Sequence, residues 1–228
     1  MPGILYAIPT PLGGAAAASL PAPALATVRA LRHFVVENAK SARALLKEIG
    51  SDPKEMQILE INEKSNLDDL LKPLHDGHSV GLLSEAGCPA IADPGATLVE
   101  AAQSAGIQVV PLIGPSSIVL ALMASGLEGQ RFAFCGYLPR EPGERKKKIK
   151  ELEARSRRER ETQIFIETPY RNDVLLGALL EVLSENTRLC LATDLTLGTE
   201  SVKTATAKDW KARQPAIGKR PTVFLLLS

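Results

Sequence analysis

Short apolar runs alternate with longer amphipathic segments through the first half of the chain. Apolar runs bounded by glycine, proline or polar residues are typical of strands, and they lie at 4–8, 34–36, 57–61, 79–83 and 108–112. Segments with apolar residues three or four positions apart predict helices, and they lie at 21–31, 41–49, 66–77 and 97–105. Strands that alternate with helices form parallel sheets with helices on both faces, and we expect that architecture here.

The pattern becomes less regular in the second half. Further strands are predicted at 132–137, 163–167, 189–192 and 223–227, with an apolar helix at 172–183, a short helix around Trp210 and a hairpin through 197–205. The change predicts two domains, an N-terminal α/β domain at 1–112 with a parallel sheet and a C-terminal α+β domain at 113–228. No Gly/Ser-rich linker separates them, so we expect them to pack closely.

The composition is that of an ordinary globular protein, with 45% hydrophobic and 23% charged residues among 228. Only 4% are aromatic, so the core depends on aliphatic side chains. The three cysteines (88, 135 and 190) are odd in number and widely spaced, which argues against a disulfide framework or a four-cysteine zinc site. No Lys or Arg precedes Arg29, and no apolar stretch approaches the ~20 residues that span a bilayer. We therefore expect a cytoplasmic protein that binds neither membrane nor metal.

The net charge of +1 hides a basic segment at 140–160, which carries ten basic and five acidic side chains. The rest of the chain carries 17 basic and 21 acidic ones. Such a segment is ordinarily a solvated face of a polar helix. The alternative is a surface for RNA phosphates, with Tyr137 and Tyr170 as stacking surfaces on either side.

Three loops rich in glycine, proline and small residues follow predicted strands, at 9–14, 84–95 and 111–117. Ligands of open α/β sheets bind beyond the carboxyl ends of the strands. Glycine allows close approach to the backbone and proline stiffens a loop, so these loops suit a ligand held by main-chain groups. For any single loop, ordinary turn chemistry is the simpler explanation.

Several common catalytic signatures are missing. The sequence contains no GxGxxG after the first strand, no GxxxxGK[ST] and no GxSxG. The histidines are not spaced as metal ligands, and Cys88 has no histidine nearby in the sequence that would make it a nucleophile. Glu37, Glu85 and Asp93 follow predicted strands and are candidates for a general base, but a structural role for each is favoured. No catalytic residue is assigned.

Five motifs appear in order along nearly the whole chain. They are 9–13 (PTPLG), 84–95 (SEAGCPAIADPG), 110–117 (VPLIGPSS), 131–140 (RFAFCGYLPR) and 164–171 (IFIETPYR). They resemble ATPIG, SDAGTPxISDPG, VxPIPGPSA, RFxFxGFLPR and LIFYESPHR of the ribosomal small subunit methyltransferase I group. This group belongs to the tetrapyrrole methylase superfamily and methylates a cytidine 2′-oxygen of 16S ribosomal RNA.

The resemblance implies a tetrapyrrole methylase-like fold, with two α/β domains and an S-adenosylmethionine cleft between them. It also implies a homodimer and accounts for the missing GxGxxG, because this class binds its cofactor without that fingerprint. Carried over by position, the cofactor-binding residues are Pro11, Ala86, Gly87, Cys88, Ile91, Ser116, Ser117, Glu167 and Leu195.

Other segments depart from the family pattern. GNLEDI is here GGAAAA at 13–18, CEDTRxTxxLL is VENAKSARALL at 36–46, and TKxHE is TLGTE at 196–200. The cofactor loops are therefore retained while segments on the acceptor side differ, which indicates a divergent member. The chain ends at its last predicted strand, so we expect it to lack the C-terminal helical extension of larger members.

The first hypothesis is an S-adenosylmethionine-dependent methyltransferase that modifies a ribose 2′-oxygen of ribosomal RNA, with the small ribosomal subunit as partner. The second is methyl transfer to a tetrapyrrole or another small acceptor. The third is a non-catalytic protein that binds S-adenosylmethionine. The basic segment favours RNA, a deep apolar acceptor pocket would favour the second hypothesis, and the altered segments keep the third open.

Overall fold

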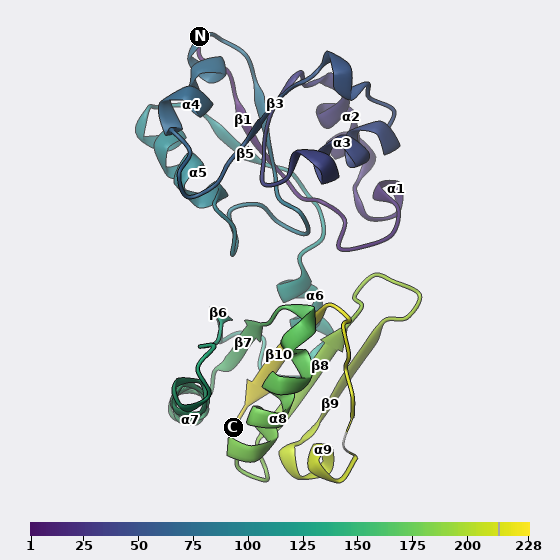
Figure 1. The fold of residues 1–228 in the computed structure, drawn as a ribbon, viewed down its shortest axis with the longest axis vertical. Coiled ribbons are helices and arrows are strands. Elements are labelled where there is room, and N and C mark those ends of the chain that lie inside the picture. Colours follow the sequence, from purple (N-terminus) through teal and green to yellow (C-terminus); the bar gives the residue numbers. More distant parts are fainter. Residues whose placement is uncertain (214) are drawn as a thin grey trace. The chain divides into compact units, whose positions relative to one another are not determined.

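The computed structural model describes residues 1–213 and 215–228 and divides into two compact units (Figure 1). The N-terminal unit is Met1–Ser116 and the C-terminal unit is Ser117–Ser228. Each unit contains its own five-stranded sheet. In the part of the chain that is described, no helix has both the length and the apolar character needed to cross a bilayer.

The sheet of the N-terminal unit is wholly parallel, in the order β3-β2-β4-β1-β5. Its strands are β1 (Leu5–Ile8), β2 (His33–Val36), β3 (Gln57–Glu60), β4 (Val80–Leu83) and β5 (Val109–Pro111). Every residue of β4 is buried, which agrees with the continuous apolar run in the sequence. All the strands expected in this half of the chain are present.

Helices cover both faces of this sheet, as the alternating pattern predicted (Figure 1). They are α1 (Ala16–Ser19), α2 (Ala22–Ala30), α3 (Ala39–Glu48), α4 (Leu67–His75) and α5 (Gly95–Ser104), with a 3₁₀ turn, η1 (Pro53–Glu55). Successive strand residues point to opposite faces, so Phe34 joins the cluster beneath α2 and α3 while Val35 joins the cluster beneath α4 and α5.

Local signals in the sequence explain where these helices begin and end. The Asn66 side chain caps α4 by accepting a hydrogen bond from the Asp68 amide at 3.0 Å, as expected. Asn38 caps α3 in the same way, accepting from the amides of Lys40 and Ser41. Gly50 follows α3 with a φ of +86°, a conformation that favours glycine at the end of a helix.

The sheet of the C-terminal unit is mixed, in the order β6-β7-β10-β8-β9, with only β6 and β7 parallel. Its strands are β6 (Phe132–Tyr137), β7 (Thr162–Ile166), β8 (Arg188–Thr193), β9 (Ser201–Thr206) and β10 (Thr222–Leu227). Its helices are α6 (Ser117–Ser125), α7 (Pro142–Glu159), α8 (Asn172–Val182) and α9 (Ala207–Arg213), with a 3₁₀ turn, η2 (Pro169–Arg171). The hairpin expected at 197–205 is instead formed by β8 and β9 around a loop at 194–200.

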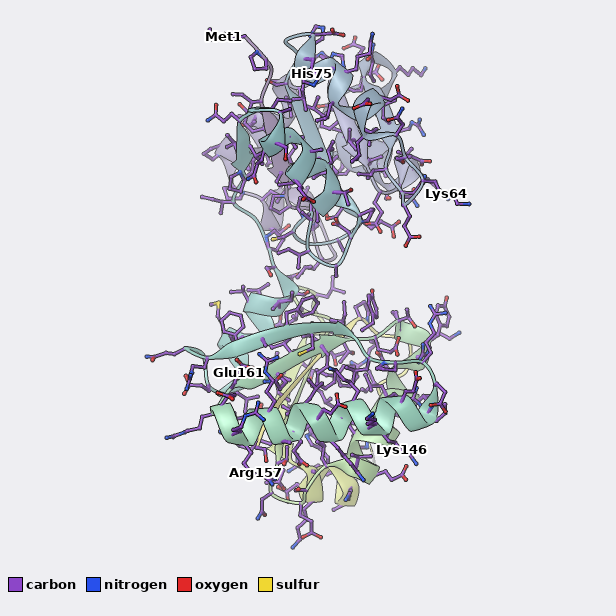
Figure 2. The ribbon with its side chains drawn as sticks, turned by 90° about the vertical axis from the view of Figure 1, so that its left-hand side faces the viewer. Met1, Lys64, His75, Lys146, Arg157 and Glu161 are labelled. Atoms are coloured by element: carbon purple, nitrogen blue, oxygen red, sulfur yellow. The ribbon has the colours of Figure 1, made fainter. Side chains whose placement is uncertain are left out.

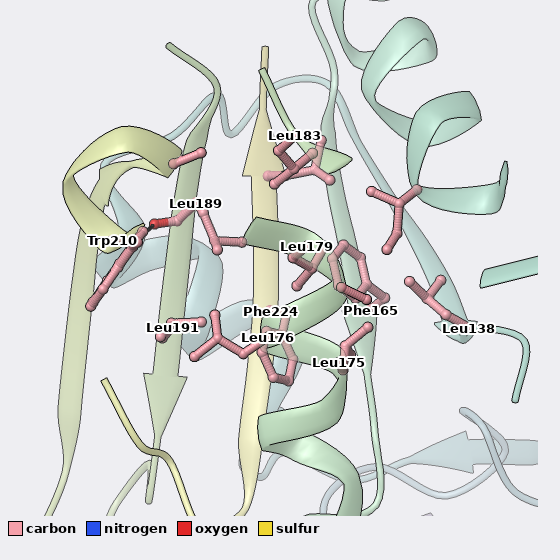
Figure 3. Packing of buried hydrophobic residues seen from close by; sticks show 14 of the residues in the cluster. Leu138, Phe165, Leu175, Leu176, Leu179, Leu183, Leu189, Leu191, Trp210 and Phe224 are labelled. Carbon is pink, nitrogen blue, oxygen red and sulfur yellow. Dashed lines mark hydrogen bonds between the residues drawn. The ribbon is translucent and has the colours of Figure 1, made fainter. Parts of the chain in front are cut away.

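Two aromatic rings lie in the core of the C-terminal unit (Figure 3). Phe165 of β7 and Phe224 of β10 are paired across the strands, with ring centroids 5.9 Å apart and planes 4° from parallel. The apolar face of α8 packs on them. Trp210 of α9 closes one side of the cluster, and its indole N–H donates a hydrogen bond of 2.8 Å to the carbonyl of Leu189.

This packing predicts that Phe165→Ala lowers the free energy of unfolding of the C-terminal unit by about 3–5 kcal/mol, because it removes a fully buried ring. Trp210 is the only tryptophan, so its fluorescence during urea unfolding reports on this unit. Phe132→Ala is the matched control, since Phe132 is 44% exposed and its removal should cost less than about 1 kcal/mol. Equal losses for the two variants would contradict the core described here.

Candidate functional site

The three loops singled out in the sequence leave one edge of the N-terminal sheet. They follow β4, β1 and β5, which are neighbours in the sheet and run parallel. Because carboxyl ends of parallel strands meet at the same edge, the loops that begin at Pro9, Ser84 and Leu112 emerge side by side. This edge is the position expected for a ligand in a sheet of this kind.

Two of the loops are joined by a reciprocal pair of main-chain hydrogen bonds. The Thr10 amide donates to the Gly87 carbonyl at 2.8 Å, and the Gly87 amide donates to the Thr10 carbonyl at 3.1 Å. The Ser84 hydroxyl also donates to the Gly87 carbonyl, at 3.2 Å. We call this pair the Thr10–Gly87 bridge, and it fixes the loop after β1 against the loop after β4.

The third loop is attached through Cys88. The Cys88 thiol donates to the Pro115 carbonyl, with Sγ 3.5 Å from the oxygen. Burial raises the pKa of this thiol, and a hydrogen bond with the Ser116 side chain partly opposes the rise. A thiol with a raised pKa is a poor nucleophile, which agrees with the lack of a histidine near Cys88 in the sequence. The three loops therefore form one connected surface, which we call the loop cluster.

Two glycines in the loop cluster cannot be replaced without strain, Gly87 because of its backbone conformation and Gly114 because a side chain would clash with Pro9. Gly87 has a φ of +79°, which strains any L-residue, and a Cβ there would lie 3.3 Å from the Leu12 side chain. A Cβ on Gly114 would lie 2.4 Å from the Cβ of Pro9, closer than two carbon atoms can approach. The cluster is thus built for close packing of backbone on backbone.

Left-handed conformations also occur in the loop cluster at residues that carry side chains. Ala90 and Ala92 have φ values of +65° and +62°. Strained residues of this kind persist where their surroundings hold them and are concentrated at ligand sites. Asp93 supplies the restraint for Ala90, because one of its oxygens accepts hydrogen bonds from the amides of Ala90 (2.8 Å) and Gly95 (2.7 Å).

Two of the carboxylates considered as bases hold the loops. Burial raises the pKa of Asp93, although its two amide bonds oppose the rise. Glu37, directly after β2, accepts a hydrogen bond of 3.2 Å from the Glu85 amide. Burial raises the pKa of Glu37, the amide bond opposes this, and the charges of Asp93 and Glu85 add to the rise. Both groups have structural roles, so the structure assigns no catalytic base.

The structure brings together the predicted site residues that belong to the N-terminal unit. They lie on the loop cluster and are Pro11, Ala86, Gly87, Cys88, Ile91 and Ser116. Gly87 is buried at the bridge, whereas the Ile91 side chain is 48% exposed and therefore accessible to a ligand.

The remaining predicted residues belong to the C-terminal unit. Ser117 is the first residue of α6. Glu167 follows the last residue of β7, and Leu195 lies two residues after the end of β8. Both strands run antiparallel to β10, so their carboxyl ends, and with them these two residues, lie at the same edge of the second sheet. Glu167 is 7% exposed, accepts a hydrogen bond from the Thr168 amide at 2.8 Å and forms an ion pair with Arg171 at 3.2 Å.

Leu195 sits in a constrained turn. Its neighbours Asp194 and Thr196 have φ values of +53° and +72°, which only strong local restraints maintain in residues with side chains. The Asp194 carboxylate accepts a hydrogen bond from Thr199 at 3.0 Å and lies 3.6 Å from the Arg220 guanidinium. The turn that carries Leu195 is therefore fixed by polar contacts within the unit.

Sequence reasoning missed Thr10, Gly114 and the Pro115 carbonyl, although each was inside a loop it singled out. Their contribution is made by main-chain atoms or by close packing, which residue type does not reveal. Among the residues that are described, no group of three or more His, Cys, Asp or Glu side chains is placed to hold a metal ion.

A model of the tetrapyrrole (corrin/porphyrin) methylases matches residues 5–210, and the chain belongs to this family of S-adenosylmethionine-dependent methyltransferases. The relatives include proteins named ribosomal RNA small subunit methyltransferase I. The one from Escherichia coli O157:H7 is 35% identical over 200 residues, which cover 88% of this chain and 68% of that protein. The one from Neisseria meningitidis serogroup B is 34% identical over 218 residues, which cover 96% and 72%.

Solved structures agree with the fold. The methyltransferase CobJ superposes with a TM-score of 0.67 at 17% identity, covering 100% of this chain and 95% of that one. Uroporphyrin-III-C-methyltransferase from Thermus thermophilus superposes with a TM-score of 0.60 at 19% identity, covering 100% and 93%. These comparisons confirm the predicted family, the tetrapyrrole methylase-like fold and S-adenosylmethionine as the cofactor.

The raised pKa of Glu37 predicts a stability that depends on pH. The folded state favours the neutral carboxyl, so wild-type stability falls as pH rises above the ordinary glutamate value of 4.5 towards the raised one. Glu37→Gln keeps an acceptor for the Glu85 amide but cannot ionise. Its stability relative to wild type, from urea unfolding, should increase between about pH 4 and pH 7. A difference that stays constant over this range would contradict the half-buried setting of Glu37.

Proposed function

We propose that this methyltransferase transfers a methyl group to a ribose 2′-oxygen of ribosomal RNA in the small ribosomal subunit. The single observation that carries the proposal is the loop cluster, joined by the Thr10–Gly87 bridge, in a chain about one-third identical to small subunit methyltransferases. The relatives' names supply the substrate class. The basic helix α7 gives independent support for RNA.

The loop cluster fits S-adenosylmethionine as a surface of backbone atoms. Gly87 leaves a place that a Cβ would fill, next to main-chain groups held in fixed positions by the bridge and by Asp93. We assign cofactor contacts to Pro11, Ala86, Gly87, Cys88, Ile91 and Ser116 in the N-terminal unit and to Ser117, Glu167 and Leu195 in the C-terminal unit. A ligand that is bound by main-chain atoms requires loops of fixed conformation. The prolines of the loops and the hydrogen bonds of Asp93 hold that conformation.

The chemistry asks for positioning more than for a strong catalytic group. When bound, S-adenosylmethionine supplies a methyl group on a sulfonium, which departs as a neutral thioether while the ribose oxygen gains the methyl and its proton passes to solvent. The chain's own task is to hold donor and acceptor in line and to exclude water. The hydrogen bonds of Glu37 and Asp93 serve this task by fixing the loops.

We propose an RNA-binding surface that includes only part of the basic segment at 140–160, because several of its cations are paired with carboxylates. Four cations of this segment are neutralised by nearby carboxylates, in the pairs Lys146–Glu181, Lys148–Glu151, Arg155–Glu161 and Arg158–Glu159. Among the described residues, the exposed cations of this segment that form no ion pair are Arg140, Lys147, Lys150, Arg157 and Arg160. Lys147 and Lys150 belong to α7, the helix on which Figure 2 labels Lys146 and Arg157. We propose that these two lysines contact RNA phosphates, since an unpaired cation is free to replace the counterions of RNA.

We further propose that the enzyme works in the cytoplasm as a homodimer. A ribosomal substrate implies the compartment in which ribosomes are assembled, and the family resemblance implies the dimer. The observation that favours RNA over a tetrapyrrole acceptor is the local excess of positive charge at 140–160.

The function is tested by transfer of tritiated methyl groups from S-adenosylmethionine to small ribosomal subunits from cells that lack this protein. Transfer that maps to a ribose 2′-oxygen is the expected result. Transfer to a porphyrinogen but not to subunits would support the small-acceptor alternative. Cofactor binding without transfer to either would support a non-catalytic protein.

The assignment of the loop cluster predicts that Gly87→Ala weakens S-adenosylmethionine binding by at least about tenfold, or ~1.4 kcal/mol. The methyl group strains the φ of +79° and approaches the Leu12 side chain at the bridge. Isothermal titration calorimetry measures the affinity. Gly106→Ala is the control, because Gly106 has a φ of +70° but no atom within 4 Å of its Cβ position. Equal affinity of a folded Gly87→Ala protein would refute the assignment.

The assignment of Lys147 and Lys150 to RNA phosphates predicts that the double variant Lys147→Ala, Lys150→Ala binds RNA more weakly. The slope of log binding constant against log salt concentration should become shallower, by about one unit for each phosphate that the variant no longer neutralises. Affinity for S-adenosylmethionine should not change. The double variant of the paired residues, Lys146→Ala with Lys148→Ala, should change the salt slope less. Filter binding to small-subunit RNA at several salt concentrations distinguishes them, and equal slopes for both double variants would count against the surface.

A further inference from the structure

A cavity of about 240 Å³ opens beside the loop cluster, within the N-terminal unit. One wall is the loop after β1, with Thr10, Pro11, Gly13 and Gly14. The opposite wall is one face of α3, and Ser84 and Glu85 after β4 close the third side. The cavity therefore borders two of the three loops assigned to the cofactor.

The walls of the cavity have a definite chemical character. The α3 face lines the cavity mainly with small side chains, those of Ser41, Ala42 and Ala44, together with Leu45. The charged groups are Glu48 and Glu85, and no Lys or Arg lines the cavity. Among the described residues neither carboxylate forms an ion pair, although one oxygen of Glu48 accepts a hydrogen bond from the Ala16 amide at 2.6 Å.

This chemistry selects a ligand with hydrogen-bond donors and no negative charge. Carboxylates accept hydrogen bonds from hydroxyl and amino groups and repel phosphate. The volume lies below the ~300–1,000 Å³ of pockets for drug-sized ligands, so the cavity is too small to enclose a tetrapyrrole macrocycle. A single nucleoside, with ribose hydroxyls and base amino groups, matches both the size and the charge.

We propose that this cavity receives the target nucleoside of the RNA, with its hydroxyl or amino donors directed to Glu85 and Glu48 and its phosphates outside. The proposal rests on the proposed function and names the place of the acceptor. The cavity shares Thr10 and Pro11 with the loop cluster, so a nucleoside inside it lies against the backbone assigned to the methyl donor. That adjacency is what in-line transfer between two bound reactants requires.

Filling the cavity tests the proposal. Ala44 is exposed on the cavity face of α3, so Ala44→Trp can fold while its indole occupies the space of the nucleoside. The expected result is a KM for undermethylated small subunits raised by at least about tenfold, with S-adenosylmethionine affinity within about twofold of wild type. Lys47→Trp is the matched control, because Lys47 is exposed on the same helix and does not line the cavity. It should keep the wild-type KM.

A second variant leaves the volume unchanged. Glu85→Gln removes the negative charge while its main-chain bond to Glu37 remains, and it should raise the same KM. Wild-type KM in both Ala44→Trp and Glu85→Gln would overturn the proposal while the proposed function stands. Loss of S-adenosylmethionine binding in Ala44→Trp would also overturn it, because the cavity would then hold the cofactor. A wild-type protein that transfers no methyl to subunits would instead refute the proposed function, and this assignment with it.

Discussion

The Thr10–Gly87 bridge is the contact on which the candidate site depends. The strands before these residues run parallel, yet the bridge pairs the two loops in the antiparallel sense, which requires the loop after β4 to reverse direction at once. The positive φ of Gly87 makes that reversal possible. The bridge thereby converts two flexible connections into a fixed surface at the sheet edge, and the Cys88 contact adds the third loop to it.

A surface of this kind suits the chemistry of the family. Transfer of a methyl group needs collinear reactants and a dry site more than an acid or a nucleophile. This requirement is consistent with the half-buried carboxylates, Glu37 and Asp93, being engaged with amides of the loops. It also agrees with the raised pKa of the Cys88 thiol, which makes that side chain a packing group.

The sequence predicted much of the fold because its signals are local. The spacing and length of the apolar runs identified the strands of the N-terminal sheet. Asn66 marked the start of a helix through its capping hydrogen bond, and Gly50 marked the end of another through its positive φ. The prediction of a hairpin at 197–205 was wrong in its bounds, because residues 194–200 form the turn itself, which Asp194 holds through Thr199 and Arg220, and β8 is the first strand of the hairpin. The motifs identified the family, and glycine and proline indicated which loops matter.

Other features depended on positions in space that residue type does not encode. The bridge joins residues 77 positions apart through their main-chain amides and carbonyls, and the Thr10 hydroxyl also donates to the Gly87 carbonyl at 3.5 Å. The sequence shows a net excess of five positive charges at 140–160, whereas in the structure carboxylates from outside this segment, Glu181 and Glu161, neutralise two of its cations. The cavity is built from Gly13, Gly14 and the face of α3, which belong to two segments that differ from the family motifs.

The most direct test of the loop cluster is a titration of ¹⁵N-labelled protein with S-adenosylmethionine, followed by amide chemical shifts. Binding by main-chain atoms predicts that the amides of Ala86, Gly87, Cys88 and Ser116 shift most. Saturation that leaves these four amides unmoved would contradict the central claim, wherever else in the chain the shifts appeared.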